Sequence, residues 1–200
     1  RSVLQREIRN HGQNAQINNA VDRLAISLRN IKQAVSTEEC MGIEGEAAAH
    51  YFSVFNELLR GSGFVFGGRV RRPPTDPVNA LLSFVYSLIT QECISALQGV
   101  GLDPYVGFLH RDRPGRASLA LDLLEEFRSA WADRFVLTLI NRRQVQLSDF
   151  ITESSGAVRL KDDARKNLLV AYQERKQVEV LHPYLEEQVP IGLLPHCQAM

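Results

Sequence analysis

Residues 76–89 read Asp-Pro-Val-Asn-Ala-Leu-Leu-Ser-Phe-Val-Tyr-Ser-Leu-Ile, and this stretch decides the fold class. Asp76 is a favourable N-cap residue and Pro77 suits the first helical position, so a helix is predicted to begin here. The apolar side chains that follow cover nearly every face of the helix, and Gly99 and Gly101 end it. A helix that is apolar all round is typical of the centre of a bundle.

The segments on either side are also predicted to be helical, because apolar residues recur in them at helical spacing. Their predicted ranges are 16–35, 37–60, 117–141 and 161–180, and 148–160 could hold a short β-hairpin. The sequence therefore predicts a mainly α-helical fold, a single domain over 1–200 with at most a small hairpin near Ile151 to Arg159. The two long apolar helices, 78–98 and 118–140, are expected to form its centre.

The composition is that of an ordinary globular chain. Of 200 residues, 44% are apolar and 23% are charged, and 23 basic side chains balance 23 acidic ones, which excludes a disordered, collagen-like or generally polybasic protein. Cys40, Cys93 and Cys197 lie far apart without CxxC partners, which favours free thiols in a reducing cytoplasm. No leader or run of 18 apolar residues is apparent, and a start at Arg1 indicates a chain that is processed or cut from something longer.

Charge is unevenly distributed along the sequence. The first 35 residues contain six basic and two acidic side chains, and the loop from Arg60 to Arg72 contains four basic and no acidic ones. This pattern would suit a face that binds phosphates. The alternative is a solvated surface on which basic residues cluster by chance.

Three stretches could carry chemistry. In Gly42-Ile43-Glu44-Gly45-Glu46, two glycines inside a helix cost about 0.5–1 kcal/mol each, which indicates close approach by a ligand, a metal or another backbone. His110 follows an apolar stretch at the end of an element and leads into a basic loop, although a lone histidine is more often structural.

The third stretch is the helix that contains Asp122, Glu125 and Glu126, which share one face because they lie three and four residues apart. A cation would relieve their mutual repulsion. The alternative is that they are surface acids paired with Arg128 and Arg134. Two carboxylates and one histidine could together hold a divalent ion; oxygen ligands favour Mg²⁺ or Mn²⁺, and the imidazole favours Mn²⁺.

Four longer motifs follow one another along the chain. They are Met41-Gly-Ile-Glu-Gly-Glu-Ala-Ala48 with Tyr51-Phe52, Arg71-Arg-Pro-Pro74 with Asp76–Ser83, Asp103–His110, and Ser118–Arg128. Together they resemble the large helical domain of the CRISPR-associated integrase family, the metal-dependent enzymes that insert new spacers into CRISPR arrays. The resemblance covers nearly the whole chain in the same order, and the tail around 182–185 and 191–195 resembles the subgroup of type I-C and related systems.

The resemblance implies a set of functional residues. By position, the metal ligands would be Glu44, His110 and Glu125, where Glu125 departs from the aspartate often found in the family. Asp122 matches a second acid that supports the site, and is the alternative third ligand. Asn79 matches a recurrent polar residue on the neighbouring helix. The approach of DNA to the metal would be lined by arginines, namely Arg69, Arg71, Arg72, Arg111, Arg113 and Arg116.

The resemblance also implies a reaction and partners. The reaction is transesterification, in which the 3′-OH of a double-stranded prespacer attacks a phosphodiester at the end of the CRISPR repeat, with weak nuclease cleavage at the same site. The partners are a second copy of the chain, a small ferredoxin-like second CRISPR-associated protein and a spacer-trimming nuclease, fused or separate. The family's N-terminal β-rich domain, expected to carry most of the dimer contact, is not matched, and the acidic segment 179–198 is a candidate protein-contact surface.

A different class of function remains open from the residues alone. The chain could be a non-catalytic helical scaffold that binds nucleic acid or protein, with the same acids in surface salt bridges. The two differ in one geometric respect. In the enzyme, Glu44, His110 and Glu125 must converge on one point.

Overall fold

The computed structural model describes residues 1–111, 113–182 and 186–200. The chain divides into two compact units, Arg1–Arg72 and Pro73–Met200, which are described separately below. The prediction that 1–200 forms one catalytic domain stays a prediction. The fold class is confirmed, since both units are mainly helical and the strands form only two small sheets among the described residues.

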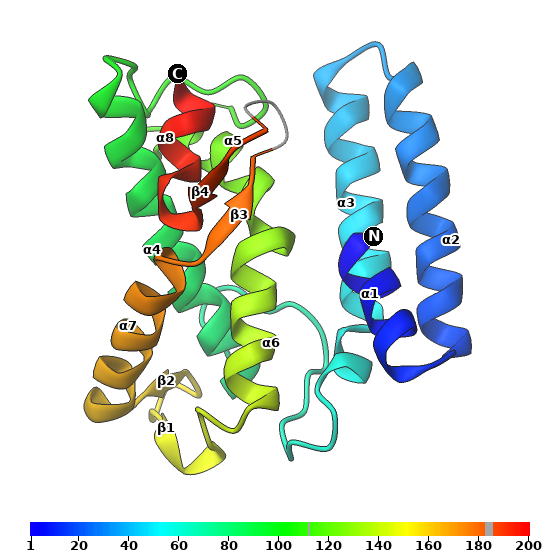
Figure 1. Cartoon of the computed structure of the whole chain (residues 1–200), viewed down its shortest axis with the longest axis vertical. Coiled ribbons are helices and arrows are strands. Elements are labelled where there is room, and N and C mark those ends of the chain that lie inside the picture. The colour runs from blue at the N-terminus through cyan, green and yellow to red at the C-terminus, as the bar shows by residue number, and fades with distance from the viewer. Residues whose placement is uncertain (112, 183–185) are drawn as a thin grey trace. The chain divides into compact units, whose positions relative to one another are not determined.

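The first unit is a helical hairpin with a short helix beside it (Figure 1). Its α2 begins after Asn14, whose side chain accepts hydrogen bonds from the amides of Gln16 and Ile17. Its α3 begins after Ser36, whose hydroxyl accepts from the amide of Glu39. The helices are α1 (Ser2–His11), α2 (Ala15–Asn30), α3 (Thr37–Ser53) and two short 3₁₀ turns, Ile31–Gln33 and Phe55–Leu58.

The helices of this unit are shorter than the sequence predicted. The predicted helix 37–60 ends at Ser53, and the predicted helix 16–35 finishes as a 3₁₀ turn. The α1 helix was not predicted, although its Leu4 is fully buried. Its Glu7 also forms an ion pair with Arg60 at 2.8 Å, which ties α1 to the start of the basic loop.

The second unit is built on α4 (Pro77–Gly99), and here the sequence prediction is confirmed. The Asp76 side chain caps the helix by accepting from the amide of Asn79 at 2.9 Å. Val78, Leu81 and Ile89 are completely buried, as expected for the centre of a bundle. By length and composition α4 could also cross a membrane, but half of its most apolar window is buried in the protein, as in core helices of soluble proteins.

The predicted helix 117–141 is continuous, but its middle is π-helical and not α-helical. It consists of α5 (Ser118–Phe127), a π-helical segment (Arg128–Asp133) and α6 (Arg134–Asn141). It packs beside α4, as Figure 1 shows, and Trp131 in its π segment stacks on Tyr172 of α7 (Asp162–Lys176) with parallel rings 5.7 Å apart. A single regular helix was the wrong expectation for this segment.

Two small antiparallel sheets complete the second unit. The predicted hairpin is confirmed as β1 (Phe150–Thr152) paired with β2 (Val158–Leu160). A second sheet pairs β3 (Glu179–Leu181) with β4 (Gln188–Pro190), and a 3₁₀ turn (Ile191–Leu193) and α8 (Leu194–Ala199) follow it. The sequence did not anticipate this second sheet in the acidic segment 179–198, of which residues 183–185 lie outside the described part of the chain.

Candidate functional site

The loop before α5 is folded tightly onto that helix. The Pro104 carbonyl accepts from the amides of Leu119 and Ala120 at 2.9 and 3.2 Å, in the first turn of α5. Gly107 lies so close to α5 that a Cβ atom built on it would be 2.6 Å from the Cβ of Ser118. The loop therefore needs glycine at this position, and this packing brings the backbone of residues 108–110 over the side chain of Asp122.

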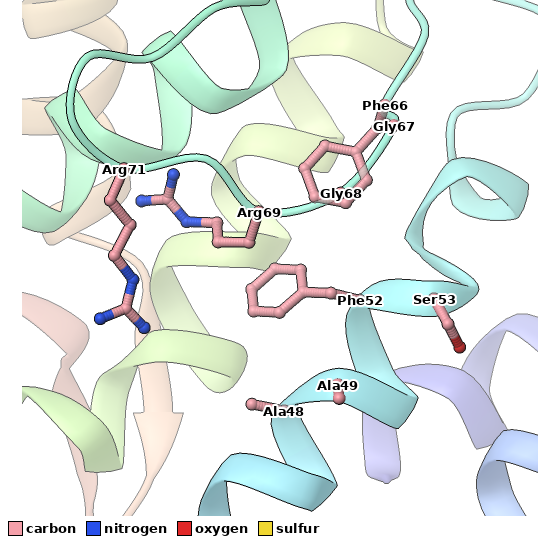
Figure 2. A pocket seen from close by; sticks show the side chains of 9 residues that line it. All are labelled: Ala48, Ala49, Phe52, Ser53, Phe66, Gly67, Gly68, Arg69 and Arg71. Atoms are coloured by element: carbon pink, nitrogen blue, oxygen red, sulfur yellow. The ribbon is translucent and has the colours of Figure 1, made fainter.

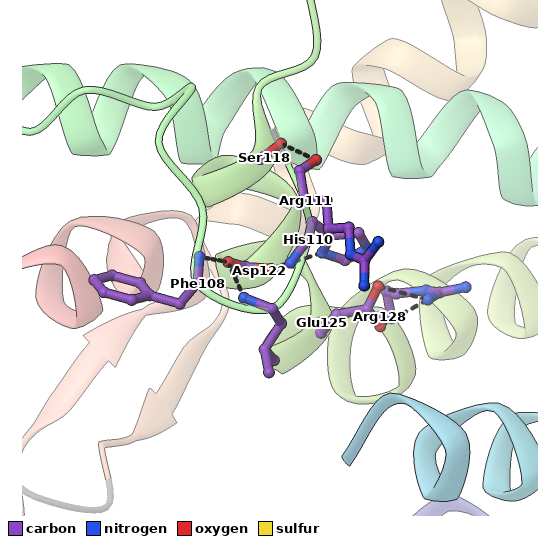
Figure 3. A network of polar contacts seen from close by, with 8 residues as sticks. Phe108, His110, Arg111, Ser118, Asp122, Glu125 and Arg128 are labelled. Carbon is purple, nitrogen blue, oxygen red and sulfur yellow. Dashed lines mark hydrogen bonds and ion pairs between the residues drawn. The ribbon is translucent and has the colours of Figure 1, made fainter. Parts of the chain in front are cut away.

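Asp122 is the centre of a hydrogen-bond network in this loop (Figure 3). Its Oδ2 accepts from the backbone amides of Phe108 and Leu109 at 2.7 and 3.0 Å. Its Oδ1 accepts from the amide of His110 at 3.0 Å and lies 2.6 Å from Nδ1 of the His110 ring. In Figure 3 the Phe108 ring points away from the carboxylate that holds its amide.

The network keeps Asp122 ionised. Burial alone would raise the pKa of its carboxyl group, but the hydrogen bonds from the His110 ring and the three backbone amides outweigh it and lower the pKa below its usual value. A carboxylate is an acceptor only, so the proton between the two side chains belongs to Nδ1 of His110. The Nε2 atom of a neutral His110 then carries the lone pair, which is the arrangement of most metal-binding histidines.

Glu125 lies on α5 one turn after Asp122, and both of its carboxylate oxygens are 2.6 Å from Nη1 of Arg128. Burial would lower the pKa of Arg128, but the Glu125 carboxylate and the Tyr86 hydroxyl raise it overall. The Arg128 guanidinium also lies 5.0 Å from the centre of the Tyr86 ring. The pairing with Arg128 considered from the sequence is present for Glu125, whereas Asp122 binds the loop instead.

Buried groups extend this network into the core. The Tyr86 hydroxyl donates a hydrogen bond to Asp133 at 2.5 Å, and Asp133 is 1% exposed. Burial and then the neighbouring Asp133 carboxylate raise the pKa of Tyr86 well above its usual value. Sequence reasoning missed this pair. The only signal was an acid, Asp133, directly after the short apolar run Ala130-Trp131-Ala132.

The predicted ligand Glu44 is exposed on α3 in the first unit, whereas His110 and Glu125 belong to the second. Within the described residues, neither unit by itself gathers three His, Cys, Asp or Glu side chains closely enough to hold an ion. The residues present nevertheless fit a divalent ion in donor chemistry, since they offer an imidazole nitrogen and carboxylate oxygens. The predicted ligand set stays a prediction.

The predicted DNA-binding arginines also divide between the units. Arg69 is half-buried and donates from Nη1 to the Val70 carbonyl at 2.9 Å, while Arg71 and Arg72 are exposed. In the second unit, Arg111 and Arg113 are exposed and Arg116 is half-buried. Their role in DNA binding stays a prediction.

Asn79 is fully buried at the start of α4. Its Nδ2 donates to the second carboxylate oxygen of Asp76 at 2.5 Å, in addition to the backbone cap. These two hydrogen bonds to Asp76 reinforce the start of α4. A supporting role for Asn79 in the site stays a prediction.

Comparison with known proteins identifies the family. The family model described as CRISPR associated protein Cas1 matches residues 1–174. The chain belongs to the Cas1 family. The CRISPR-associated endonuclease Cas1 2 of Rhodospirillum rubrum is 53% identical over 208 residues, which cover 100% of this Cas1 chain and 60% of that protein. A CRISPR-associated exonuclease Cas4/endonuclease Cas1 fusion of Geobacter sulfurreducens is 43% identical and covers 100% of this chain and 36% of the fusion.

Two solved structures share the fold of this chain. A casposase bound to its integration product matches with a TM-score of 0.80 and 27% identity, over 98% of this chain and 56% of the casposase. A chain of a Cas6-RT-Cas1–Cas2 complex matches with a TM-score of 0.82 and 26% identity, over 98% of this chain and 21% of that chain. Compared with the Rhodospirillum relative, this Cas1 chain spans about three fifths of the length.

Proposed function

We propose that this chain is the catalytic part of a metal-dependent DNA integrase and endonuclease that inserts new spacers into CRISPR arrays. The observation that carries the proposal is the His110–Asp122 pair, which sets the histidine tautomer needed for metal binding. Membership of the Cas1 family supports the same conclusion, as does the likeness to a casposase bound to an integration product.

In this proposal Glu44, His110 and Glu125 hold Mg²⁺ or Mn²⁺, and Asp122 holds the histidine. The bound ion would polarise the phosphodiester and stabilise the oxygen that leaves it. Because Asp122 is saturated by four donors, it is better suited to orient His110 than to act as a ligand itself. Glu125 is the better third ligand. The Glu125 carboxylate must then bind the ion and Arg128 together, or give up its contact with Arg128.

The reaction proposed is transesterification. The 3′ oxygen of the incoming DNA forms a new bond to phosphorus as the bond to the neighbouring 3′ oxygen at the repeat end breaks. The number of phosphodiester bonds is unchanged, so no external source of energy is required. No protein nucleophile takes part, and endonuclease cleavage differs only in that water replaces the 3′-OH. The arginines at 69, 71, 72, 111, 113 and 116 would bind phosphates of the prespacer and repeat duplexes without reading their sequence.

The proposed partners follow from the relatives. A Cas1 chain stands beside Cas2 in the matched complex, and a Cas4 exonuclease is fused to Cas1 in the Geobacter protein. We propose that this chain acts in the prokaryotic cytoplasm as a dimer with a second copy. It would join a small ferredoxin-like second CRISPR-associated protein and receive DNA trimmed by a nuclease, fused or separate.

The test is a half-site integration assay on the complete natural chain that contains this sequence, with and without Mn²⁺. The expected result is a branched DNA product that forms only with the ion and is lost in Glu44→Ala and His110→Ala. A non-catalytic scaffold would bind the same DNA with no product under either condition, and that result would reject the proposal.

A further inference from the structure

A series of side-chain contacts leads from Glu125 on α5 into the core of the second unit. Both carboxylate oxygens of Glu125 accept from Nη1 of Arg128 at 2.6 Å (Figure 3). The Arg128 guanidinium lies 5.0 Å from the centre of the Tyr86 ring and forms a hydrogen bond with the Tyr86 hydroxyl. That hydroxyl donates to Asp133 at 2.5 Å. A predicted metal ligand is thereby connected to a carboxylate that is 1% exposed.

The chemistry of these groups fixes the direction of every hydrogen bond in the series. A guanidinium can only donate and an ionised carboxylate can only accept. The Tyr86 hydroxyl has one proton, which goes to Asp133, so its oxygen is the acceptor for Arg128. Arg128 is therefore held between two acceptors, the Tyr86 hydroxyl and the Glu125 carboxylate.

The π-helical segment makes this arrangement possible. Arg128 and Asp133 are its first and last residues and lie five positions apart. In a regular α-helix, residues five apart point about 140° away from each other around the helix axis. A π turn, whose hydrogen bonds join residues i and i+5, instead places them on the same side of the helix, one above the other. Both side chains can therefore reach Tyr86, which belongs to the neighbouring α4.

Arg128 is placed differently from the arginines that the sequence assigns to DNA. Figure 2 shows Arg71 extending beside a pocket of the first unit, between α3 and the loop of residues 66–71, and Arg71 is exposed. The Arg128 side chain is only 13% exposed and is bound to acceptors within the protein. A buried arginine of this kind is better suited to fix a neighbouring acid than to contact a phosphate.

The contact between Arg128 and Glu125 leaves part of the carboxylate available. Each carboxylate oxygen has two lone pairs, and one nitrogen, Nη1, binds both oxygens of Glu125. Each oxygen therefore keeps a lone pair for an ion. Without the Tyr86 hydroxyl, the guanidinium could turn and bind Glu125 through two nitrogens, as arginine–carboxylate pairs often do. Such a pair would compete more strongly with an ion for the same oxygens.

We propose that Tyr86 and Asp133 are positioning residues for Glu125 and that they act through Arg128. Asp133 orients the Tyr86 hydroxyl, the hydroxyl holds the guanidinium, and the guanidinium orients the carboxylate. The inference rests on the proposed function for the choice of a divalent ion as the partner of Glu125. Neither Tyr86 nor Asp133 touches the ion.

The test is Mn²⁺ binding by the complete natural chain that contains this sequence, without DNA. Electron paramagnetic resonance distinguishes free from bound Mn²⁺ and records the spectrum of the bound ion. Tyr86→Phe removes only the hydroxyl. Tyr172→Phe is the matched control, because Tyr172 is 1% exposed and stacks on Trp131 of the same π-helical segment. Its hydroxyl has no hydrogen-bond partner among the described residues.

We expect Tyr86→Phe to weaken Mn²⁺ binding about tenfold, as for other residues that orient a ligand, and to change the spectrum of the bound ion. Tyr172→Phe should do neither. Arg128→Lys keeps the charge but loses the planar fork that reaches two acceptors, so it should also weaken binding about tenfold. If Tyr86 acts through Arg128, the double variant should stay about tenfold weaker than the wild type instead of reaching about 100-fold.

Unchanged Mn²⁺ affinity in Tyr86→Phe would overturn the proposal, as would an equal loss in Tyr172→Phe or a loss of about 100-fold in the double variant. Unchanged affinity in Arg128→Lys would also overturn it, and this result does not depend on the folding of Tyr86→Phe. A wild type that binds Mn²⁺ but never integrates DNA would reject the proposed function and leave the positioning role standing. Integration by a wild type whose Tyr86→Phe variant binds Mn²⁺ equally well would reject the positioning role alone.

Discussion

Asp122 binds His110 twice, through the ring Nδ1 at 2.6 Å and through the backbone amide at 3.0 Å. One carboxylate on α5 therefore fixes both the position of the histidine backbone and the tautomer of its ring. This relationship separates Asp122 and Glu125 of α5 by role, since Asp122 is occupied by the loop and Glu125 by a single arginine.

Loss of either predicted ligand outside α5 should stop the reaction. We expect Glu44→Ala and His110→Ala each to lower Mn²⁺-dependent half-site integration at least about 100-fold, because each removes a group that holds the ion. Thermal unfolding should show an intact fold, since Glu44 is exposed and His110 is half-buried. Wild-type rates in either variant would contradict the ligand assignment.

Substitution of Glu125 and substitution of Asp122 should weaken metal binding to different extents. Glu125→Ala should abolish Mn²⁺ binding measured by titration calorimetry, as expected for a ligand. Asp122→Asn should weaken it about 10–100-fold, because residues that orient a ligand have effects of that size. The asparagine keeps the side-chain size, although its NH₂ group cannot accept the loop amides. A greater loss of binding in Asp122→Asn than in Glu125→Ala would make Asp122 the third ligand.

The same carboxylate predicts a dependence of stability on acid pH. The folded pKa of Asp122 is below its ordinary value, so its contribution is complete above the unfolded pKa of about 3.9 and is lost as the pH falls through the lower folded pKa. Urea unfolding of the wild type and Asp122→Asn from pH 7 to pH 2.5 should show a difference in free energy that shrinks only below about pH 4. A constant difference would contradict this.

Gly107→Ala should disturb the site although residue 107 bears no functional group. The added methyl group would lie 2.7 Å from the His110 carbonyl oxygen and 2.6 Å from the Cβ of Ser118, so the loop must move off α5. We expect a loss of about 1–3 kcal/mol in unfolding free energy, as for other overpacked sites, together with weaker Mn²⁺ binding. Gly99→Ala is the control, and equal behaviour of the two variants would mean that the loop adapts without cost.

Charge reversal should reveal the DNA-binding arginines through the effect of salt. The double variant Arg71→Glu with Arg113→Glu should lower the slope of log K against log salt for duplex DNA by about 0.9 for each phosphate that the protein no longer neutralises. The decrease should be the same for unrelated DNA sequences. Lys166→Glu on the exposed face of α7 is the control. An unchanged slope in the double variant would contradict the prediction that the two basic loops contact DNA phosphates.

The sequence predicted the elements whose boundaries are set by neighbouring residues in the chain. Asp76 and Pro77 mark the start of α4 because a cap acts on its own first turn, and the turn around Gly156 marks the β1–β2 hairpin. The three-residue strands β3 and β4 have no comparable signal, because their pairing depends on the packing of the segment as a whole. The π-helical segment was missed because its apolar residues also fit a regular helix over a short window.

The candidate site was predictable only in part for the same reason. Spacing alone placed Asp122 and Glu125 on one face of a helix. It could not show that residues 108–110 fold back onto Asp122, since this depends on the close approach of Gly107 to Ser118. The position of Glu44 relative to these residues is a matter of tertiary arrangement, which no spacing along the chain encodes.

The π-helical segment Arg128–Asp133 holds one residue more than a regular α-helix would place over the same rotation. Each residue turns an α-helix by about 100°, so this extra residue is absorbed by the wider turn and the angular phase of α6 relative to α5 is kept. The buried set of α6, which includes Phe135 and Ile140, faces the core at that phase. Deletion of one residue at exposed Ser129 or Ala130 would therefore restore a regular helix with α6 still in phase, whereas deletion of one residue inside α6 would turn the buried face that follows away from the core by about 100°.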